Sequence, residues 1–237
     1  MIPEPKILTP KPFVLPNVDK WETSNGLSVK FVEVGIIPKA YFLLSMKFGS
    51  ADELNSQVWI YRLISDYLKE GTIDLDGNQI ADKAASLGGR FDVNVDDDHL
   101  TISGSVLTEF STEFIELIGN IVKNPRFPTE SLSRLRDDLL RDLELMKVQP
   151  NILASATFRQ ALYGKSGYGL SLSTPEIINN FSTQMVINSY RKFANPYEMK
   201  LYVAGMFDQE ILKETIENTF KGWSGNTSDH IERALPE

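Results

Sequence analysis

The sequence has no cysteine among its 237 residues and only two histidines, His99 and His230. The lack of cysteine excludes disulfides, zinc ribbons and thiol chemistry. Zinc sites in proteins are built mainly from cysteine and histidine, so a zinc site within this chain is not expected. A chain without cysteine is compatible with an oxidising and with a reducing compartment, so the location of the protein stays open.

The sequence also lacks an excess of positive charge and any long apolar run. It carries 24 Lys and Arg against 32 Asp and Glu, a net charge of −8. This balance argues against a nucleic-acid partner and against binding to an anionic membrane surface. No apolar run approaches the roughly 18–20 residues that cross a bilayer. The first residues contain no long apolar segment, so we expect no signal peptide in this chain.

What the sequence does contain is a series of strand patterns. Five prolines within residues 1–20 predict an extended N-terminal arm, because proline fixes φ and lacks a backbone donor. An Asn-Gly pair at residues 25–26, between two extended runs, predicts a β-hairpin. Residues 41–48 are apolar on both alternating faces, which predicts a strand covered on both sides. Residues 90–107 predict a second hairpin, whose acidic turn at residues 96–98 is expected to lie in water.

Helices are predicted where apolar residues recur three and four positions apart, as they do on the buried face of an amphipathic helix. The expected segments are residues 56–70, 80–87, 110–121, 132–146, 152–162, 183–193 and 211–220. With a further strand over residues 199–207, strand pairs alternate with helix pairs. This order predicts an α+β domain over residues 21–223, with helices packed on one face of a mainly antiparallel sheet. Residues 224–237 show no apolar period and predict a linker.

One predicted helix carries a polar face with the spacing of a possible site. Arg62, Ser65, Asp66 and Lys69 stand at positions i, i+3, i+4 and i+7, so they share one face of a helix. Such a face can present a metal site or a catalytic pair. It can equally be the solvent-exposed side of a helix, because an Arg62–Asp66 pair in this order contributes at most a few tenths of a kcal/mol.

A second acidic stretch, residues 74–78, does not predict a calcium site. The full D-x-[DN]-x-[DN]-G loop and its later bidentate glutamate are both missing. The stretch instead predicts a turn that caps the helix that follows it.

Sequence landmarks in a fixed order give a more specific result. They are TSNGLSVKFVE, FGSADE, KEGT, ASLGGRFDVNVDDDHLTISGSVL, NPRFP, ALYGKSGYGLSLSTPEIINNFS, NPYEMKLYVAGMF and a closing GW. Through them, the chain from about Trp21 to Trp223 resembles the N-terminal domain of the pitrilysin/insulinase family of zinc metallopeptidases, which includes the mitochondrial processing peptidases. No single landmark decides the assignment, but together they cover nearly the whole chain.

The resemblance implies that the catalytic signature of this family, H-x-x-E-H, has been lost here. Counting back from the KEGT landmark, Arg62, Ser65 and Asp66 stand where the first histidine, the glutamate base and the second histidine would be. The third ligand, a glutamate in the family, corresponds to Arg141, or to Asp142 with a shift of one residue. A guanidinium cannot ligate a cation, so we expect no catalytic residues and no metal in this chain, and zinc only in an active partner.

The residues before the signature differ from the family as well. Small residues normally stand there, whereas this chain has Trp59 and Tyr61. The helix is therefore expected to be kept for its packing, without the ligands.

The resemblance also implies an architecture of homologous domains, joined by a linker and assembled into a chamber that encloses peptides. The first hypothesis is a catalytically inactive domain that completes such a chamber, binds unfolded peptides or supports an active homologous subunit or second domain. In it, the sheet edge formed by Phe91, Asp92, Val93, Asn94 and Val95 is the expected peptide contact. The second is a purely structural or assembly subunit of the same fold, without peptide binding, and the third is an active metalloendopeptidase with unusual ligands. Either of the first two roles implies a hetero-oligomer. Family habit suggests a bacterial protein in the periplasm or another exported compartment.

Overall fold

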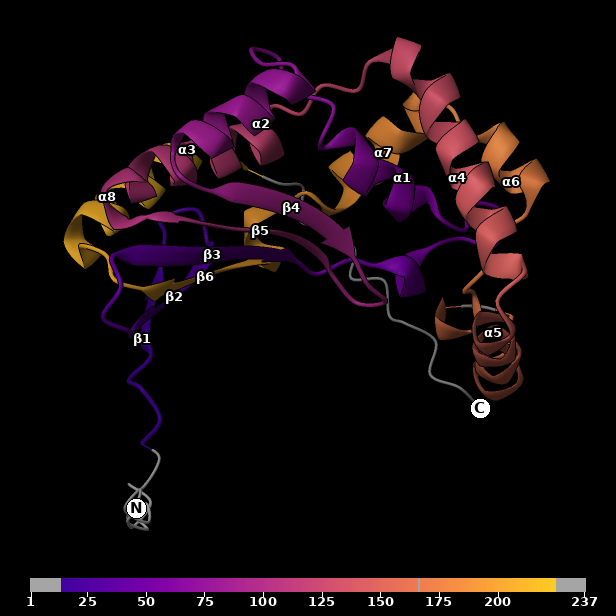
Figure 1. Ribbon diagram of the computed structural model, residues 1–237, viewed down its shortest axis with the longest axis horizontal. Helices are drawn as coiled ribbons and strands as arrows, with labels where there is room; N and C mark the ends of the chain where they lie inside the picture. Colours follow the sequence, from indigo (N-terminus) through magenta and orange to yellow (C-terminus); the bar gives the residue numbers. More distant parts are fainter. Residues whose placement is uncertain (1–13, 166, 225–237) are drawn as a thin grey trace, which may run out of the picture.

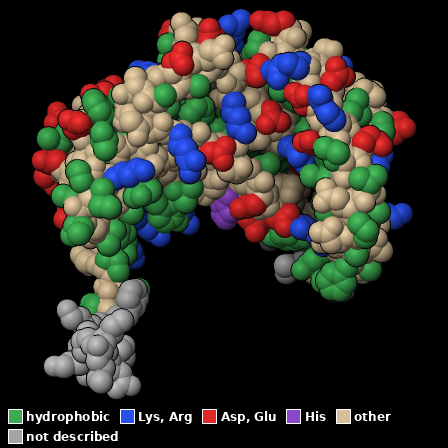
Figure 2. All heavy atoms as spheres, viewed as in Figure 1, with side chains coloured by type: hydrophobic (Ala, Val, Ile, Leu, Met, Phe, Trp, Pro, Cys, Tyr) green, Lys and Arg blue, Asp and Glu red, His purple; other side chains and the backbone are tan. Residues whose placement is uncertain are grey.

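The computed structural model describes residues 14–165 and 167–224. In this part of the chain, six strands form one sheet, and helices cover one of its faces (Figure 1). The opposite side of the molecule is hollowed, so that the molecule has the shape of an arch (Figure 2). Most of the expected proline-rich arm, the expected linker from residue 225 onward and His230 lie outside the described residues.

The sheet is mixed but mainly antiparallel, as predicted. Its strands are β1 (Asp19–Glu22), β2 (Ser28–Glu33), β3 (Lys39–Met46), β4 (Arg90–Val95), β5 (Leu100–Leu107) and β6 (Met199–Gly205). Their spatial order is β1-β2-β6-β3-β5-β4, and only the β2–β6 pair is parallel. Both predicted hairpins are present, as β1–β2 and β4–β5. Gly26 in the first turn has a φ of 88°, and a Cβ atom there would lie 2.2 Å from the ring of Tyr197, so this position requires glycine.

The helical segments follow the predicted pattern with one addition. The α-helices are α1 (Ile60–Tyr67), α2 (Gly77–Ser86), α3 (Ser111–Lys123), α4 (Leu132–Lys147), α5 (Pro150–Tyr163), α6 (Pro175–Asn180), α7 (Thr183–Phe193) and α8 (Gln209–Phe220). Single 3-10 turns are η1 (Ser50–Asp52), η2 (Thr108–Phe110), η3 (Thr129–Ser131), η4 (Gly167–Gly169) and η5 (Pro196–Glu198). The short helix α6 was not predicted. As expected, an acidic side chain in residues 74–78 caps α2, because the Asp76 carboxylate accepts a hydrogen bond from the Gln79 N–H at 2.9 Å.

The helices pack on one face of the sheet only, and this corrects one expectation. In β3, Ala40, Phe42, Leu44 and Met46 are buried, whereas the alternating Tyr41 and Leu43 are 53% and 36% exposed. The prediction that this strand is covered on both sides was therefore wrong. The reason is that α2, α3 and α8 all lie on the same side of the sheet (Figure 1). No helix of the described residues is long and apolar enough to cross a membrane.

The acidic turn between β4 and β5 corrects a second expectation. It does not simply lie in water, because it docks against three other segments, α5, η4 and η1. Asp97 accepts a hydrogen bond from the Arg159 guanidinium of α5 at 2.8 Å, and Asp98 accepts one from the Tyr168 hydroxyl at 2.6 Å. The backbone N–H groups of Ser50 and Ala51 in η1 donate to carbonyls of the same turn, each at 2.9 Å. The turn therefore fastens α5 to the rest of the molecule.

Candidate functional site

The helix that carries the predicted polar face is α1, which lies between the edge strand β4 and α4 and also contacts α7 (Figure 1). It is shorter than predicted, running from Ile60 to Tyr67 instead of over residues 56–70. Its inner side is an apolar stripe that includes the fully buried Leu63, Ile64 and Tyr67. This burial directs the polar side toward α4 and the edge of the sheet.

The start of α1 is held by a buried acid. The Glu53 carboxylate accepts hydrogen bonds from the backbone N–H groups of Trp59 at 2.8 Å and Tyr61 at 3.0 Å. It thereby satisfies two donors that the first turn of a helix leaves free. Desolvation by burial raises the pKa of Glu53 to about 8, although the two N–H donors act in the opposite direction. Sequence analysis missed Glu53 because its role depends on a contact that appears only when the chain is folded.

Trp59 explains why α1 starts late. It has a φ of 81°, the only positive φ of a non-glycine residue in the described part of the chain. A side chain in this left-handed conformation costs about 1–2 kcal/mol, which glycine does not incur. The family resemblance predicts a small residue here, and the backbone conformation gives the physical reason. The indole offsets the strain by being buried, by donating to the Ser171 carbonyl at 3.1 Å and by packing under the Arg62 guanidinium at 4.8 Å.

Arg62 forms an ion pair that connects two helices. Its Nη2 atom lies 2.7 Å from Oδ2 of Asp142 on α4, and both side chains are partly exposed. Arg141, the other candidate for the third-ligand position, is 66% exposed and pairs with Asp138 of its own helix at 2.5 Å. The structure therefore brings Asp142 to α1 and directs Arg141 into solvent.

The other two predicted positions, Ser65 and Asp66, do not provide a set of metal ligands. Ser65 donates its hydroxyl proton to the carbonyl of Arg62 at 2.8 Å, the usual back-bond of a helical serine. Burial raises the pKa of the Asp66 carboxyl, while Lys69 at 3.7 Å and the nearby Arg62 counteract the rise. The Lys69 ammonium also lies 4.0 Å from the carboxylate of Asp92 on β4.

The residues present do not fit a zinc ion. The face combines two carboxylates, Asp66 and Asp142, with the cations Arg62 and Lys69. Within residues 14–165 and 167–224, no group of three His, Cys, Asp or Glu side chains is arranged to hold a metal. The Arg62 guanidinium lies between α1 and α4 and joins the two helices through its ion pair with Asp142.

The predicted peptide contact is a sheet edge beside this face. Residues Phe91 to Val95 all lie on β4, an edge strand of the sheet whose only partner among residues 14–165 and 167–224 is β5. Val93 is buried, while Asp92 and Asn94 are exposed. The Asp92 carboxylate accepts from the Val93 N–H at 2.9 Å and from the Asn94 amide at 2.7 Å. Asp92 therefore covers a backbone donor that an added strand would use.

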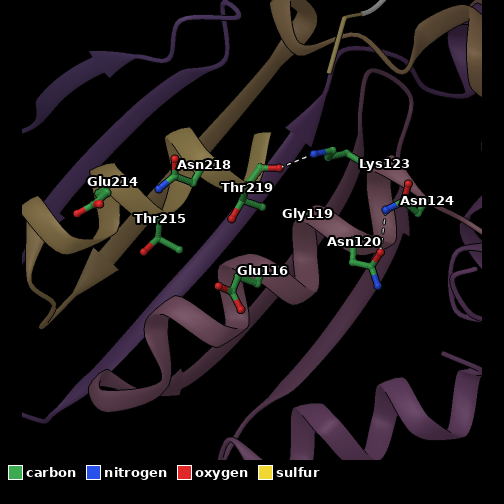
Figure 3. A pocket seen from close by; sticks show the side chains of 9 residues that line it. All are labelled: Glu116, Gly119, Asn120, Lys123, Asn124, Glu214, Thr215, Asn218 and Thr219. Atoms are coloured by element: carbon green, nitrogen blue, oxygen red, sulfur yellow. Dashed lines mark hydrogen bonds between the residues drawn. The ribbon is translucent and has the colours of Figure 1, made fainter. Parts of the chain in front are cut away.

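A separate groove lies between α3 and α8, away from α1 and β4 (Figure 3). It has a volume of about 450 Å³ and a polar lining. Lys123 donates to the carbonyl of Thr219 at 2.6 Å, and the Asn124 amide donates to Asn120 at 2.9 Å. The two helices approach closely at Gly119, which has no Cβ. A Cβ added there would lie 2.1 Å from the Thr219 side chain. The groove thus follows from helix packing, and two of the hydrogen bonds in its lining join residues that are both part of it.

No family model matches the chain, but similar curated proteins exist. It is 23% identical over 205 residues to an "Uncharacterized zinc protease" of Rickettsia bellii (strain RML369-C), covering 86% of this chain and 49% of that protein. It is 22% identical over 176 residues to the "Non-peptidase homolog YmxG" of Helicobacter pylori (strain ATCC 700392 / 26695), covering 74% of this chain and 40% of that protein. The chain therefore spans about half the length of the curated relatives it matches.

Solved structures give the same answer for the fold. The inactive domain of an M16 peptidase from Pseudomonas fluorescens superimposes with a TM-score of 0.85 at 22% identity, covering 93% of this chain and 54% of that one. A protease from Helicobacter pylori superimposes with a TM-score of 0.84 at 15% identity, covering 94% of this chain and 54% of that one. Pitrilysin superimposes with a TM-score of 0.81 at 13% identity, covering 93% of this chain and 24% of that one. The chain has the α+β fold of M16 peptidase domains, so the resemblance stated from the landmarks is confirmed at the level of the fold.

Proposed function

We propose that this chain is a catalytically inactive M16-like domain, which binds peptide beside an active homologous partner. The observation that carries the proposal is the Arg62–Asp142 ion pair at 2.7 Å. It places a fixed positive charge on the helical face where the family resemblance puts the metal ligands. A guanidinium has no lone pair to offer a cation, and it stays protonated at any pH the protein meets.

The loss extends to the base that would activate water. A hydrolytic metal site needs ligands that hold the ion and a general base within reach of its water. Ser65 has no basic group, and its hydroxyl proton is donated to a carbonyl of its own helix. Asp66 is a carboxylate, but it lies beside Lys69 and Arg62 rather than beside a second ligand. These contacts support an inactive domain over an active endopeptidase.

Peptide binding is proposed for the edge of β4, at Phe91, Asp92, Val93, Asn94 and Val95. An edge strand offers alternating backbone donors and acceptors that an extended peptide can use, and on β4 a peptide would have to displace the Asp92 carboxylate from the Val93 N–H or leave that donor to it. On β4 the exposed Asp92 connects this edge to α1 through Lys69 at 4.0 Å. A bound peptide would therefore run past the degenerate site, in contact with both elements.

The partner is proposed from the length of the relatives. This chain covers about half of several of them, so the remaining half corresponds to another domain of similar size. We propose that this second, homologous unit follows residues 224–237 in the same protein or belongs to a separate subunit. An active unit of this kind would supply the H-x-x-E-H signature that the present chain lacks.

The proposal is tested by affinity purification of the tagged chain from its source organism, followed by mass spectrometry. We expect co-purification of a homologue that carries H-x-x-E-H and zinc, and retention of unfolded peptides by the purified chain. Cleavage of those peptides should require the homologue. If no homologue is recovered and no unfolded peptide is retained, the purely structural role is the better description.

A further inference from the structure

The face of the sheet opposite the helices has an unusual charge for this protein. The cross-strand register places Lys20, Lys30, Lys39, Arg90 and Lys200 on this open face, together with the carboxylates Glu22 and Asp92. Cations therefore outnumber acids there, although the chain as a whole carries a net charge of −8. No residue of this face is buried in the described structure.

Aromatic and apolar side chains lie between the cations. Tyr202 and Leu43 occupy the centre of the face on neighbouring strands, and the Lys30 ammonium lies 5.2 Å from the centre of the Tyr202 ring. Lys39 lies 5.4 Å from the ring of Tyr41 in the same way. A cation over a tyrosine ring keeps its charge, so both lysines still attract an anion. Such a surface combines positive charge with flat apolar area.

A hollow is present in this face, with a volume of about 260 Å³. Its walls come from Ser45, Lys47, His99, Tyr197, Glu198, Lys200 and Tyr202. Glu198 is the one carboxylate among them, and it lies 3.7 Å from Lys47. Lys200 projects from the middle strand β6 and is exposed, and the described residues place no carboxylate within ion-pair distance of it. The hollow thus has the size and charge to receive a carboxylate side chain.

We infer that the open face of the sheet binds acidic, extended polypeptide segments, with Lys200 and Lys30 contacting their carboxylates. This inference rests on the proposed peptide binding and adds a second contact surface, separate from the edge of β4, that selects peptides rich in Asp and Glu. The inference is based on charge complementarity, because a cationic surface on an acidic protein favours anionic partners and repels cationic ones. Tyr41 and Tyr202 add apolar contact area that does not depend on the sequence of the bound peptide.

The inference is tested by fluorescence anisotropy with three labelled peptides of equal length and aromatic content, which differ only in carrying Glu, Gln or Lys at the same positions. The full chain should bind the Glu peptide about tenfold more tightly than the Gln peptide, as expected for several exposed ion pairs acting together. Lys200→Glu and Lys30→Glu should each remove most of this preference. The preference should weaken between 20 mM and about 300 mM salt, because exposed charges are screened.

The matched control is Lys83→Glu, which makes the same charge change on the exposed surface of α2, on the helical side of the sheet. It should leave the preference unchanged. If the Glu and Gln peptides bind equally, peptide binding stands and the acidic specificity is refuted. If none of the three binds, the proposed function fails as well. Equally tight binding of a single-stranded oligonucleotide, or dimerisation of the chain through this face in sedimentation, would also overturn the inference.

Discussion

The two sides of α1 differ in how firmly the surrounding structure holds them. Glu53, Trp59 and Tyr61, which frame the start of the helix, are 6%, 5% and 3% exposed. The polar side, where Arg62 meets Asp142, has side chains that are 30% and 44% exposed. A buried framework tolerates few changes, because unsatisfied donors and cavities destabilise the fold. Half-exposed charges can be exchanged with little change in stability. Residues on the polar side of α1 can therefore be exchanged while the buried side keeps the helix in place.

The largest effect is expected from removing the buried acid at the start of α1. Glu53→Ala leaves the backbone N–H groups of Trp59 and Tyr61 without an acceptor in a buried place, and we expect a loss of about 3 kcal/mol in the free energy of unfolding. Urea denaturation measures it. Glu53→Gln keeps an acceptor oxygen for one of the two N–H groups only, so its loss should be about half as large. Equal losses for the two variants would show that the framework depends on side-chain volume instead.

The same acid should make stability depend on pH. Its pKa is about 8 in the folded protein and 4.5 in the unfolded chain, so between these values the folded state holds a proton that the unfolded state releases. This contribution is complete below pH 4.5 and is lost as the pH rises through 8, at about 1.4 kcal/mol per pH unit between the two values. Denaturation at pH 5 and pH 8.5 measures it, and Glu53→Gln should flatten the profile. A profile with the same slope in Glu53→Gln would assign the dependence to other groups.

A smaller effect is expected on the polar side. Arg62→Ala and Asp142→Ala should each lower the free energy of unfolding by about 1 kcal/mol, with a coupling energy of roughly 0.5 kcal/mol in a double-mutant cycle. The exposed Arg141–Asp138 pair on α4 provides the control, and Arg141→Ala should change stability by less than about 0.5 kcal/mol. A coupling energy above about 2 kcal/mol would place the Arg62 pair in the rigid framework.

No effect is expected from metal. Because the donor set does not fit zinc, neither added Zn²⁺ nor EDTA should shift the melting temperature of the unaltered chain, and elemental analysis should find no zinc. The positive control combines Arg62→His, Ser65→Glu, Asp66→His and Asp142→Glu, and its melting temperature should rise with zinc, since a ligand bound only by the folded state stabilises it. One zinc per unaltered chain, removed by Asp66→Ala, would contradict the proposal.

Much of the fold could be predicted because it depends on local patterns. Residues 183–193 coincide with α7, and the Asn-Gly pair lies in the turn of the first hairpin. The open face of β3 was missed, because Tyr41 and Leu43 are apolar although they face solvent. The local sequence pattern indicates how apolar a face of a strand is. Whether that face is covered depends on how helices distant in sequence pack against the sheet.

In the candidate site, too, some features could be predicted from local sequence and others depend on the folded structure. Landmarks along the chain predicted Arg62, Ser65 and Asp66 as the degenerate positions, and all three lie on α1. Counting could not choose between Arg141 and Asp142, because one residue turns the side chain by about 100° around a helix. The roles of Glu53 and of the acidic turn at residues 96–98 depend on segments that are far apart in sequence, so no local signal reveals them.

The position of β6 has a consequence for how the protein is made. This strand lies between β2 and β3 in the sheet, although about 150 residues separate it from them in the chain. During synthesis, the β1–β2 hairpin and the β3–β5–β4 group must wait as two separate pieces until residues 199–205 leave the ribosome. Each piece meanwhile presents an unpaired strand edge, which is prone to wrong pairing. A nonsense mutation before Met199 therefore leaves the sheet in two unjoined parts, each with an exposed strand edge.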